Sequence, residues 1–518
     1  MATNANEDKV FRINNSLCHF SRNGAYLAIA FQANLLIKDV ETLDTCQSFV
    51  FVDVIQYMEW STNSEYILCA NIKRAIVQVY SIHCPQWKCK LIEGSAGLQS
   101  VTWSPDSRHI FTIADFNIQL SIWNLEQQTV SYIQNVKSSS FDKLRFSLNG
   151  ERLAVIVTEA GQDTVEIYKT KNWKISRKLI CDRLRGIDGI RWSPNDELLC
   201  IWCSSPAEPK LIIYSNTLEK HVTAFSPLET TQSSEMCNYG KELRGIENIE
   251  WIPNGQLLAI IGFNEVIVLL NHITWQPLSK LYMDPLIREC NYLTKVYKEY
   301  ADSEKVSNKR FASCEECVLH EIHERPICIE IGKKDDNDNF SIAKIKLFEF
   351  STCGQYLALN HELYPTTLWI WDIHTDYLDY LLLENPITAI KWNPVHPRLF
   401  VLSECTRVYE WTRKGANSVP MSKNMSIIDA YWHPLGEKVA LCGYNKAMIL
   451  KHTSKITHLR LSRRRTAHVH SRVFLAHIRC LESSSNENTT VDGAEGTPWY
   501  QKVTFAEGSA RQLRWGHL

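Results

Sequence analysis

A short alternating pattern recurs nine times along the chain. Each copy has an apolar, a polar and an aromatic residue, followed by small or polar residues that often include Pro, Asn, Asp or Gly, as in EWSTNS and TWSPDS. The nine aromatic residues, called anchors below, are Phe20, Trp60, Trp103, Phe146, Trp192, Trp251, Phe350, Trp392 and Trp432. Alternation with a period of two predicts a strand with two different faces, and the segment after it predicts a turn.

The residues before the anchors keep this alternation in every copy. The residue two positions earlier is always apolar: Cys18, Met58, Val101, Leu144, Ile190, Ile249, Phe348, Ile390 or Ala430. The residue between is polar in eight copies and a tyrosine in the ninth: His19, Glu59, Thr102, Arg145, Arg191, Glu250, Glu349, Lys391 and Tyr431. One face of each strand is therefore expected to be buried and the other to meet a more polar environment.

Two further apolar runs follow each turn, for example LAIA at 27–30 and LIIYSN at 211–216. The anchors lie 40 to 46 residues apart, except for two intervals of 59 and 99. Three strands at fixed offsets with a variable fourth, at this period, are typical of propeller blades. We predict an all-β fold, a WD-repeat β-propeller of about nine degenerate four-stranded repeats over residues 9–452. The repeats are called degenerate because only Trp371-Asp372 is an actual Trp-Asp pair. The alternative fold is a large α+β enzyme, which nine copies with correct alternation disfavour.

The chain start is expected to close the ring. Residues 9–13, KVFRI, alternate like a strand and precede the first anchor. We predict that they supply the outer strand of the last blade, which would remove an exposed sheet edge.

Three segments lie outside the repeat. Residues 226–243 and 283–345 are predicted insertions, and the 99-residue interval leaves open whether the second insertion hides a further blade. Residues 453–518 form a basic and polar tail whose composition is typical of disorder, with ten Lys or Arg and five Asp or Glu.

Composition narrows the class of protein. The formal net charge is -1, which provides no basic field for nucleic acid. The first residues resemble no signal peptide, and the longest apolar stretch, 256–273, is interrupted by Asn264 and Glu265, so we expect no membrane span. The 17 cysteines are then expected to be reduced thiols in the cytoplasm.

Candidate chemistry is sparse. Cys314, Cys317, His320 and His323 are residue types that bind zinc, but their spacing fits no standard structural site. No phosphate loop, nucleophile elbow or metalloprotease motif occurs, so we predict no enzyme, no catalytic residue and no cofactor. For partner binding we single out the loop with Trp87, Glu93, Gly94, Ser95 and Gly97, since its glycines allow close approach; the alternative is an inter-blade turn packed on its neighbour.

Several segments together resemble a known family. PQWKCKLIEGSAGLQSVTWSPDSRHI (85–110), QLSIWNLEQQTVSYI (119–133), VIVLLNHITWQPL (266–278), VYKE (296–299) and LWIWDIHTDYL (368–378) are similar, in order, to the WRAP-type "Wdr-eight" family of WD-repeat proteins. The resemblance covers roughly residues 10–450. Most of 283–345 and the tail do not match.

The resemblance implies a component of the centrosome, centriolar satellites or spindle pole. It further implies a coiled-coil centrosomal adaptor as partner and, as in fungal members, a minus-end-directed kinesin. The implied roles are anchoring of microtubule minus ends, spindle assembly and, in ciliated cells, early cilium formation. The alternative function is an RNA- or ribosome-associated propeller scaffold, which only the arginines at 463–465 support. A steep dependence of RNA affinity on salt would favour it.

Overall fold

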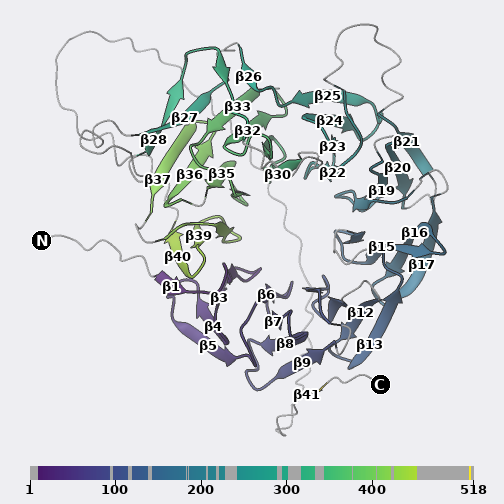
Figure 1. Ribbon diagram of the computed structural model, residues 1–518. Helices are drawn as coiled ribbons and strands as arrows, with labels where there is room; N and C mark the ends of the chain where they lie inside the picture. Colours follow the sequence, from purple (N-terminus) through teal and green to yellow (C-terminus); the bar gives the residue numbers. More distant parts are fainter. Residues whose placement is uncertain are drawn as a thin grey trace, which may run out of the picture. The chain divides into compact units, whose positions relative to one another are not determined.

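In the computed structural model the propeller has nine blades (Figure 1). The structure describes residues 10–93, 97–114, 119–137, 143–181, 184, 186–205, 208–216, 221–227, 242–288, 294–301, 317–332, 344–375, 377–403, 405–421, 425–451 and 513–514. The described residues contain strands and turns but no α-helix, and hence no helix of a length and apolarity that could cross a membrane. This confirms the predicted all-β propeller.

Each blade is an antiparallel sheet whose strands follow one another outward from the ring axis. Blade 1 comprises β2 (Cys18–Phe20), β3 (Tyr26–Phe31), β4 (Asn34–Asp39) and β5 (Thr45–Val50). Blade 2 comprises β6 (Tyr57–Trp60), β7 (Tyr66–Asn71), β8 (Ile76–Ser81) and β9 (Lys88–Ile92). Blade 3 comprises β10 (Ser100–Trp103), β11 (His109–Ile113), β12 (Gln119–Asn124) and β13 (Thr129–Gln134). A two-residue strand, β41 (Leu513–Arg514), pairs in parallel with β9.

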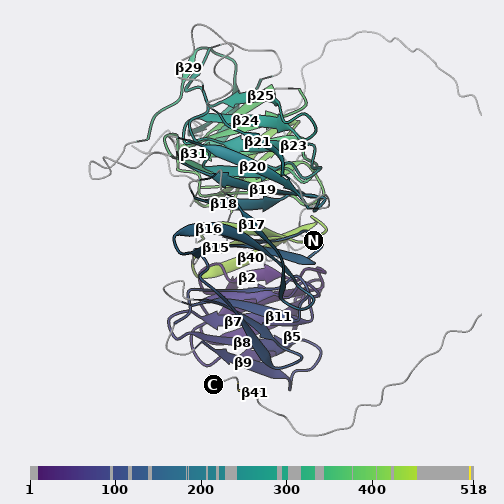
Figure 2. The same cartoon turned by 90° about the vertical axis from the view of Figure 1, so that its right-hand side faces the viewer.

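Blades 4 to 6 repeat this order. Blade 4 comprises β14 (Leu144–Phe146), β15 (Arg152–Glu159), β16 (Gln162–Lys169) and β17 (Lys174–Ile180). Blade 5 comprises β18 (Gly189–Trp192), β19 (Leu198–Cys203), β20 (Lys210–Ser215) and β21 (His221–Phe225). Blade 6 comprises β22 (Asn248–Trp251), β23 (Leu257–Ile261), β24 (Val266–Asn271) and β25 (Pro277–Tyr282). Figure 2 shows the ring of blades edge-on, with strands such as β19, β20 and β24 stacked along it.

Blades 7 to 9 complete the ring. Blade 7 comprises β30 (Ile345–Phe350), β31 (Tyr356–His361), β32 (Thr367–Asp372) and β33 (Tyr377–Leu382). Blade 8 comprises β34 (Ala389–Trp392), β35 (Arg398–Leu402), β36 (Arg407–Thr412) and β37 (Gly415–Pro420). Blade 9 comprises β38 (Asp429–Trp432), β39 (Lys438–Cys442) and β40 (Lys446–Lys451), together with β1 (Val10–Arg12). β1 pairs antiparallel with β40, Phe11 opposite Ala447, so the N-terminal strand closes the ring as predicted.

The predicted insertion at 283–345 contributes strands to blade 7. β27 (Val296–Ala301) pairs in parallel with β33 and antiparallel with β28 (Cys317–Ile322), while β26 (Leu286–Ile287) pairs with β29 (Ile327–Cys328). Among the described residues of 283–345, β27 and β28 therefore extend blade 7, β26 and β29 pair with each other, and no further four-stranded sheet forms. Glu299 of β27 is 1% exposed, and its Oε1 accepts a 2.8 Å hydrogen bond from the Tyr409 hydroxyl, which ties the hairpin to blade 8.

The core lies between the blades rather than within one central cluster. Met58 and Trp60 of blade 2 pack against Ala28 and Ile37 of blade 1, and equivalent clusters repeat around the ring. Because each blade buries its two faces against its neighbours, the fold needs the complete ring.

Candidate interaction surface around the inner strands

Every anchor is the last residue of an innermost strand, and five of the six tryptophan anchors join neighbouring blades. The indole Nε1 of Trp60 donates a 3.0 Å hydrogen bond to the carbonyl oxygen of His19 in the preceding blade. The same bond, 3.0 to 3.2 Å long, runs from Trp103, Trp192, Trp392 and Trp432 to the carbonyl groups of Glu59, Arg145, Glu349 and Lys391. The recurring aromatic is therefore both a core residue and an inter-blade hydrogen-bond donor.

The nine residues that precede the anchors form a polar belt along the innermost strands. This inner belt comprises His19, Glu59, Thr102, Arg145, Arg191, Glu250, Glu349, Lys391 and Tyr431, and all nine are half-buried. The residues on either side of them in the sequence are mostly buried. The belt is the polar face that the alternation predicts.

Belt residues of successive blades contact one another. Arg191 Nη2 lies 2.7 Å from Glu250 Oε2, and Thr102 Oγ1 donates a 3.2 Å hydrogen bond to Glu59 Oε1. The rings of His19 and Tyr431 are 4.3 Å apart, across the junction of blades 1 and 9. The regular polar position before each anchor is the signal in the sequence that could have located these contacts.

Burial shifts the ionisation of the belt. Desolvation raises the pKa of Glu349 to about 7, and desolvation also raises the pKa of Glu59 and of Glu250. Desolvation lowers the pKa of His19 to about 4, so the imidazole is neutral at pH 7. The belt thus carries less charge than its residue types suggest, and several of its polar groups already bind one another.

A groove of about 480 Å³ opens beside the belt at blades 8, 9, 1 and 2. Its apolar lining includes Trp392, Trp432, Pro394 and Pro434, and its polar lining includes His19, Arg22, Glu59, Lys391 and Tyr431. Grooves with apolar walls and a few polar groups are common sites for an anchoring side chain of a partner.

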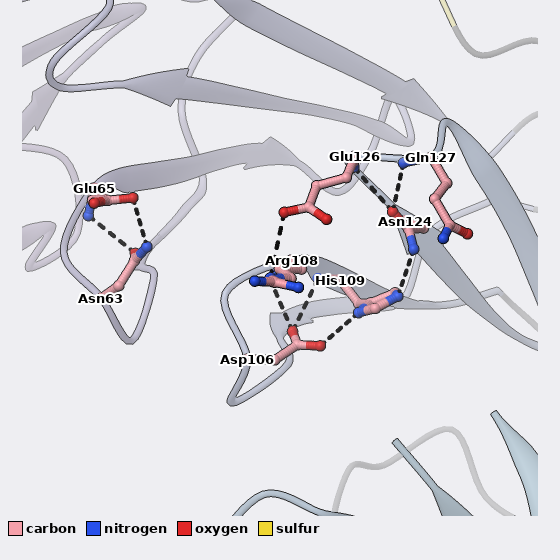
Figure 3. A network of polar contacts seen from close by, with 8 residues as sticks. All are labelled: Asn63, Glu65, Asp106, Arg108, His109, Asn124, Glu126 and Gln127. Carbon is pink, nitrogen blue, oxygen red and sulfur yellow. Dashed lines mark hydrogen bonds and ion pairs between the residues drawn. The ribbon is translucent and has the colours of Figure 1, made fainter. Parts of the chain in front are cut away.

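The turns after the anchors lie on the same face of the ring as the turns that follow the third strands. In blade 3 the two are locked together (Figure 3): His109 Nδ1 lies 2.7 Å from Asp106 Oδ2 in the first turn, and His109 Nε2 lies 2.9 Å from Asn124 Nδ2 before the second. Asn124 Oδ1 also accepts hydrogen bonds from the amides of Glu126 and Gln127. In blade 3 the two turns are accordingly held together by side-chain hydrogen bonds.

The loop singled out for partner binding is partly a structural link. Glu93 is 3% exposed, and its carboxylate accepts hydrogen bonds from Thr112 Oγ1 (2.9 Å) and Ser121 Oγ (2.5 Å) of blade 3. Trp87 is half-buried against Tyr66, with ring centroids 5.2 Å apart, and Gly97 has φ +72°. Gly94 and Ser95 lie outside the described residues. Glu93 holds blades 2 and 3 together, so partner binding by this loop stays a prediction.

The zinc candidates are only partly described. Cys314 lies outside the described residues, and Cys317 is placed only as the first residue of β28. His320 is exposed on β28, and His323 is exposed just after it. Among the described residues no group of three or more His, Cys, Asp and Glu side chains could hold a metal ion.

Nine blades built on four strands each, with indole hydrogen bonds at five of their junctions and a closing N-terminal strand, define a WD-repeat β-propeller. No protein-family model matches the chain. The chain is 32% identical over 450 residues to WD repeat-containing protein WRAP73 of Mus musculus. The aligned region covers 84% of this chain and 93% of the relative. The chain therefore belongs to the WRAP73 family of WD-repeat proteins.

The chain also has more distant similarities to a fission-yeast protein and to solved structures. An uncharacterized WD repeat-containing protein of Schizosaccharomyces pombe is 21% identical over 404 residues, covering 75% of this chain and 77% of that protein. A crystal structure of a eukaryotic initiation factor is similar with a TM-score of 0.50 at 10% identity, covering 81% and 90% of the two chains. The C-terminal WD40 domain of Sif2 has a TM-score of 0.44 at 12% identity, covering 86% and 97%.

Proposed function

We propose that this chain is a non-enzymatic scaffold of the centrosome and spindle pole that acts in the cytoplasm. It binds a coiled-coil centrosomal adaptor and a minus-end-directed kinesin, anchors microtubule minus ends, and supports spindle assembly and cilium formation. The observation that carries this proposal is the similarity to WRAP73 along 84% of the chain. The WRAP-type segments identified in the sequence provide the link from that family to the pole.

The architecture suits a scaffold. The ring is closed by the pairing of β1 with β40, and hydrogen bonds between blades join belt residues and anchors. A rigid body with several exposed loop faces can hold more than one partner without losing much conformational entropy on binding.

The test is affinity purification of the tagged full-length chain from dividing cells, followed by mass spectrometry. We expect a coiled-coil centrosomal protein and a microtubule motor to co-purify. Recovery of ribosomal or RNA-binding proteins instead, lost steeply as salt rises, would overturn the proposal in favour of an RNA-associated scaffold.

A further inference from the structure

In eight of the nine blades, all except blade 7, the turns that follow the anchors are built in two ways. In blades 1 to 6 an Asn or Asp three residues after the anchor accepts a hydrogen bond from the backbone amide two residues further on. For example, Asn23 Oδ1 accepts from Ala25 N (3.0 Å), and Asp106 Oδ1 accepts from Arg108 N (2.8 Å). The same bond occurs at Asn63, Asn149, Asn195 and Asn254. The residue three positions after the anchor is called the tip residue below. In these blades the tip residue is polar because its side chain accepts this hydrogen bond within the turn.

Blades 8 and 9 move this acceptor to the residue directly after the anchor. Asn393 Oδ1 accepts from the amides of Val395 (3.0 Å) and His396 (2.9 Å). His433 Nδ1 accepts from the amide of Leu435 (3.2 Å). The tip position is thereby released from turn chemistry, and both blades place an aliphatic side chain there.

These two side chains are open to solvent. Val395 is 55% exposed and Leu435 is 64% exposed. The two turns touch, because Asn393 Nδ2 donates a 2.9 Å hydrogen bond to the carbonyl oxygen of Gly436. The prolines that precede the tips, Pro394 and Pro434, line the groove beside the inner belt. The result is an apolar rim, formed by these four residues, that continues into a groove.

The rim favours a partner that brings its own secondary structure. The backbone amides of Val395 and Leu435 already donate hydrogen bonds within their own turns. The rim therefore offers apolar side chains and few free backbone donors to which an added strand could bind. An α-helix satisfies its backbone internally and presents apolar side chains to such a surface.

The charge beside the groove indicates the flank of that helix. Arg22, in the adjoining turn of blade 1, lines the groove, is exposed, and forms no ion pair with a described residue. Lys391 Nζ, by contrast, lies 3.2 Å from Asp429 Oδ1. The charge of Arg22 acts on Glu59 in the same groove without a close ion pair, and its exposed guanidinium favours a carboxylate on the partner.

We propose that Val395, Leu435 and the adjoining groove dock an amphipathic α-helix of the coiled-coil adaptor, with an acidic residue facing Arg22. This inference rests on the proposed function, of which it names the contact surface.

The experiment places a photo-crosslinking amino acid at position 395, 435 or 148 of the full-length chain in dividing cells. Leu148 is the matched control, a 76% exposed leucine in the equivalent turn of blade 4. We expect positions 395 and 435, but not 148, to cross-link to an adaptor segment with apolar residues at helical spacing. A synthetic peptide of that segment is then titrated against purified full-length variants.

The double variant V395D/L435D should lower the affinity for the peptide at least about tenfold, and R22E about three- to tenfold, while L148D and R22K stay within about twofold of the wild type. Circular dichroism of each variant checks that the ring is intact. Absent or equal cross-linking at 395, 435 and 148, cross-links to a second copy of this chain or to a non-helical segment, or unchanged affinity of V395D/L435D would each overturn the proposal. If the wild type recovers the adaptor and V395D/L435D does so equally, only the surface is wrong; if the wild type recovers none, the proposed function fails.

Discussion

His433 Nε2 donates a hydrogen bond of 2.9 Å to the carbonyl oxygen of Gly24, a residue 409 positions earlier in the chain. The bond joins the first turn of blade 9 to the first turn of blade 1. Nearby, Lys438 Nζ lies 2.6 Å from Glu41 Oε1 and donates a 2.9 Å hydrogen bond to the carbonyl oxygen of Val40. Together with the pairing of β1 and β40, these contacts close the ring.

Substitution of Gly24 by alanine should destabilise this junction. Gly24 has φ +77°, and an added Cβ would lie 2.4 Å from His433 Nε2. We expect G24A to lower the free energy of unfolding by about 2–4 kcal/mol, from left-handed strain plus the lost contact. Urea titration followed by tryptophan fluorescence measures the change.

The matched control for that variant is Gly161→Ala. Gly161 has φ +83° but no atom within 4 Å of an added Cβ, so G161A isolates the backbone strain, about 1 kcal/mol. Equal losses in the two variants would show that the contact with His433 contributes nothing to ring closure.

The indole hydrogen bonds between blades should each contribute measurable stability. Trp60→Phe keeps most of the buried ring but removes the donor to the His19 carbonyl, and we expect a loss of about 1 kcal/mol. Trp87→Phe is the control, because the Trp87 indole donates to no described residue. Thermal unfolding in which both variants shift the midpoint equally would contradict the role assigned to the anchors.

Glu349 should make stability depend on pH. Burial raises its pKa from 4.5 to about 7, so the folded state holds the proton more tightly than the unfolded state. The contribution is complete below about pH 4.5 and is lost as the pH rises through 7, so the free energy of unfolding falls over that range. After discounting for partial exposure we expect about 1–2 kcal/mol.

Urea midpoints at pH values from 4.5 to 7.5 test this dependence. E349Q, which stays neutral throughout, should have a flatter profile than the wild type. E151Q alters an exposed glutamate and should keep the wild-type profile. Parallel profiles for the wild type and E349Q would refute the assignment to Glu349.

The repeat pattern predicted far more of the ring than of its surfaces. Each anchor ends an innermost strand, as local alternation and turn chemistry predict, and Val10–Arg12 within the predicted residues 9–13 form the closing strand. That closure was predictable because a ring of blades leaves a sheet edge that the strand before the first blade can cover. β27 was not predicted, since its pairing with β33 joins Val296 to Tyr380 in parallel, and no local periodicity encodes a partner so far along the chain. Glu93 shows the same limit: only the folded contacts with Thr112 and Ser121 distinguish a buried link from a binding loop.

The hairpin β27–β28 should loosen when Glu299 is replaced. E299A leaves the Tyr409 hydroxyl and the Glu384 amide without their acceptor, at a cost of about 3 kcal/mol. Hydrogen exchange should rise in residues 296–301 and 317–322 while the distant blade 3 keeps its protection. E321A removes an exposed carboxylate from the same hairpin and should leave exchange unchanged; faster exchange in both variants, or in neither, would contradict the link.

Fluorescence imaging of the tagged full-length chain through mitosis in living cells shows whether the protein acts as a scaffold of the spindle pole. We expect it to concentrate at both poles together with a coiled-coil centrosomal adaptor. A signal that remains diffuse from prophase to anaphase would contradict it.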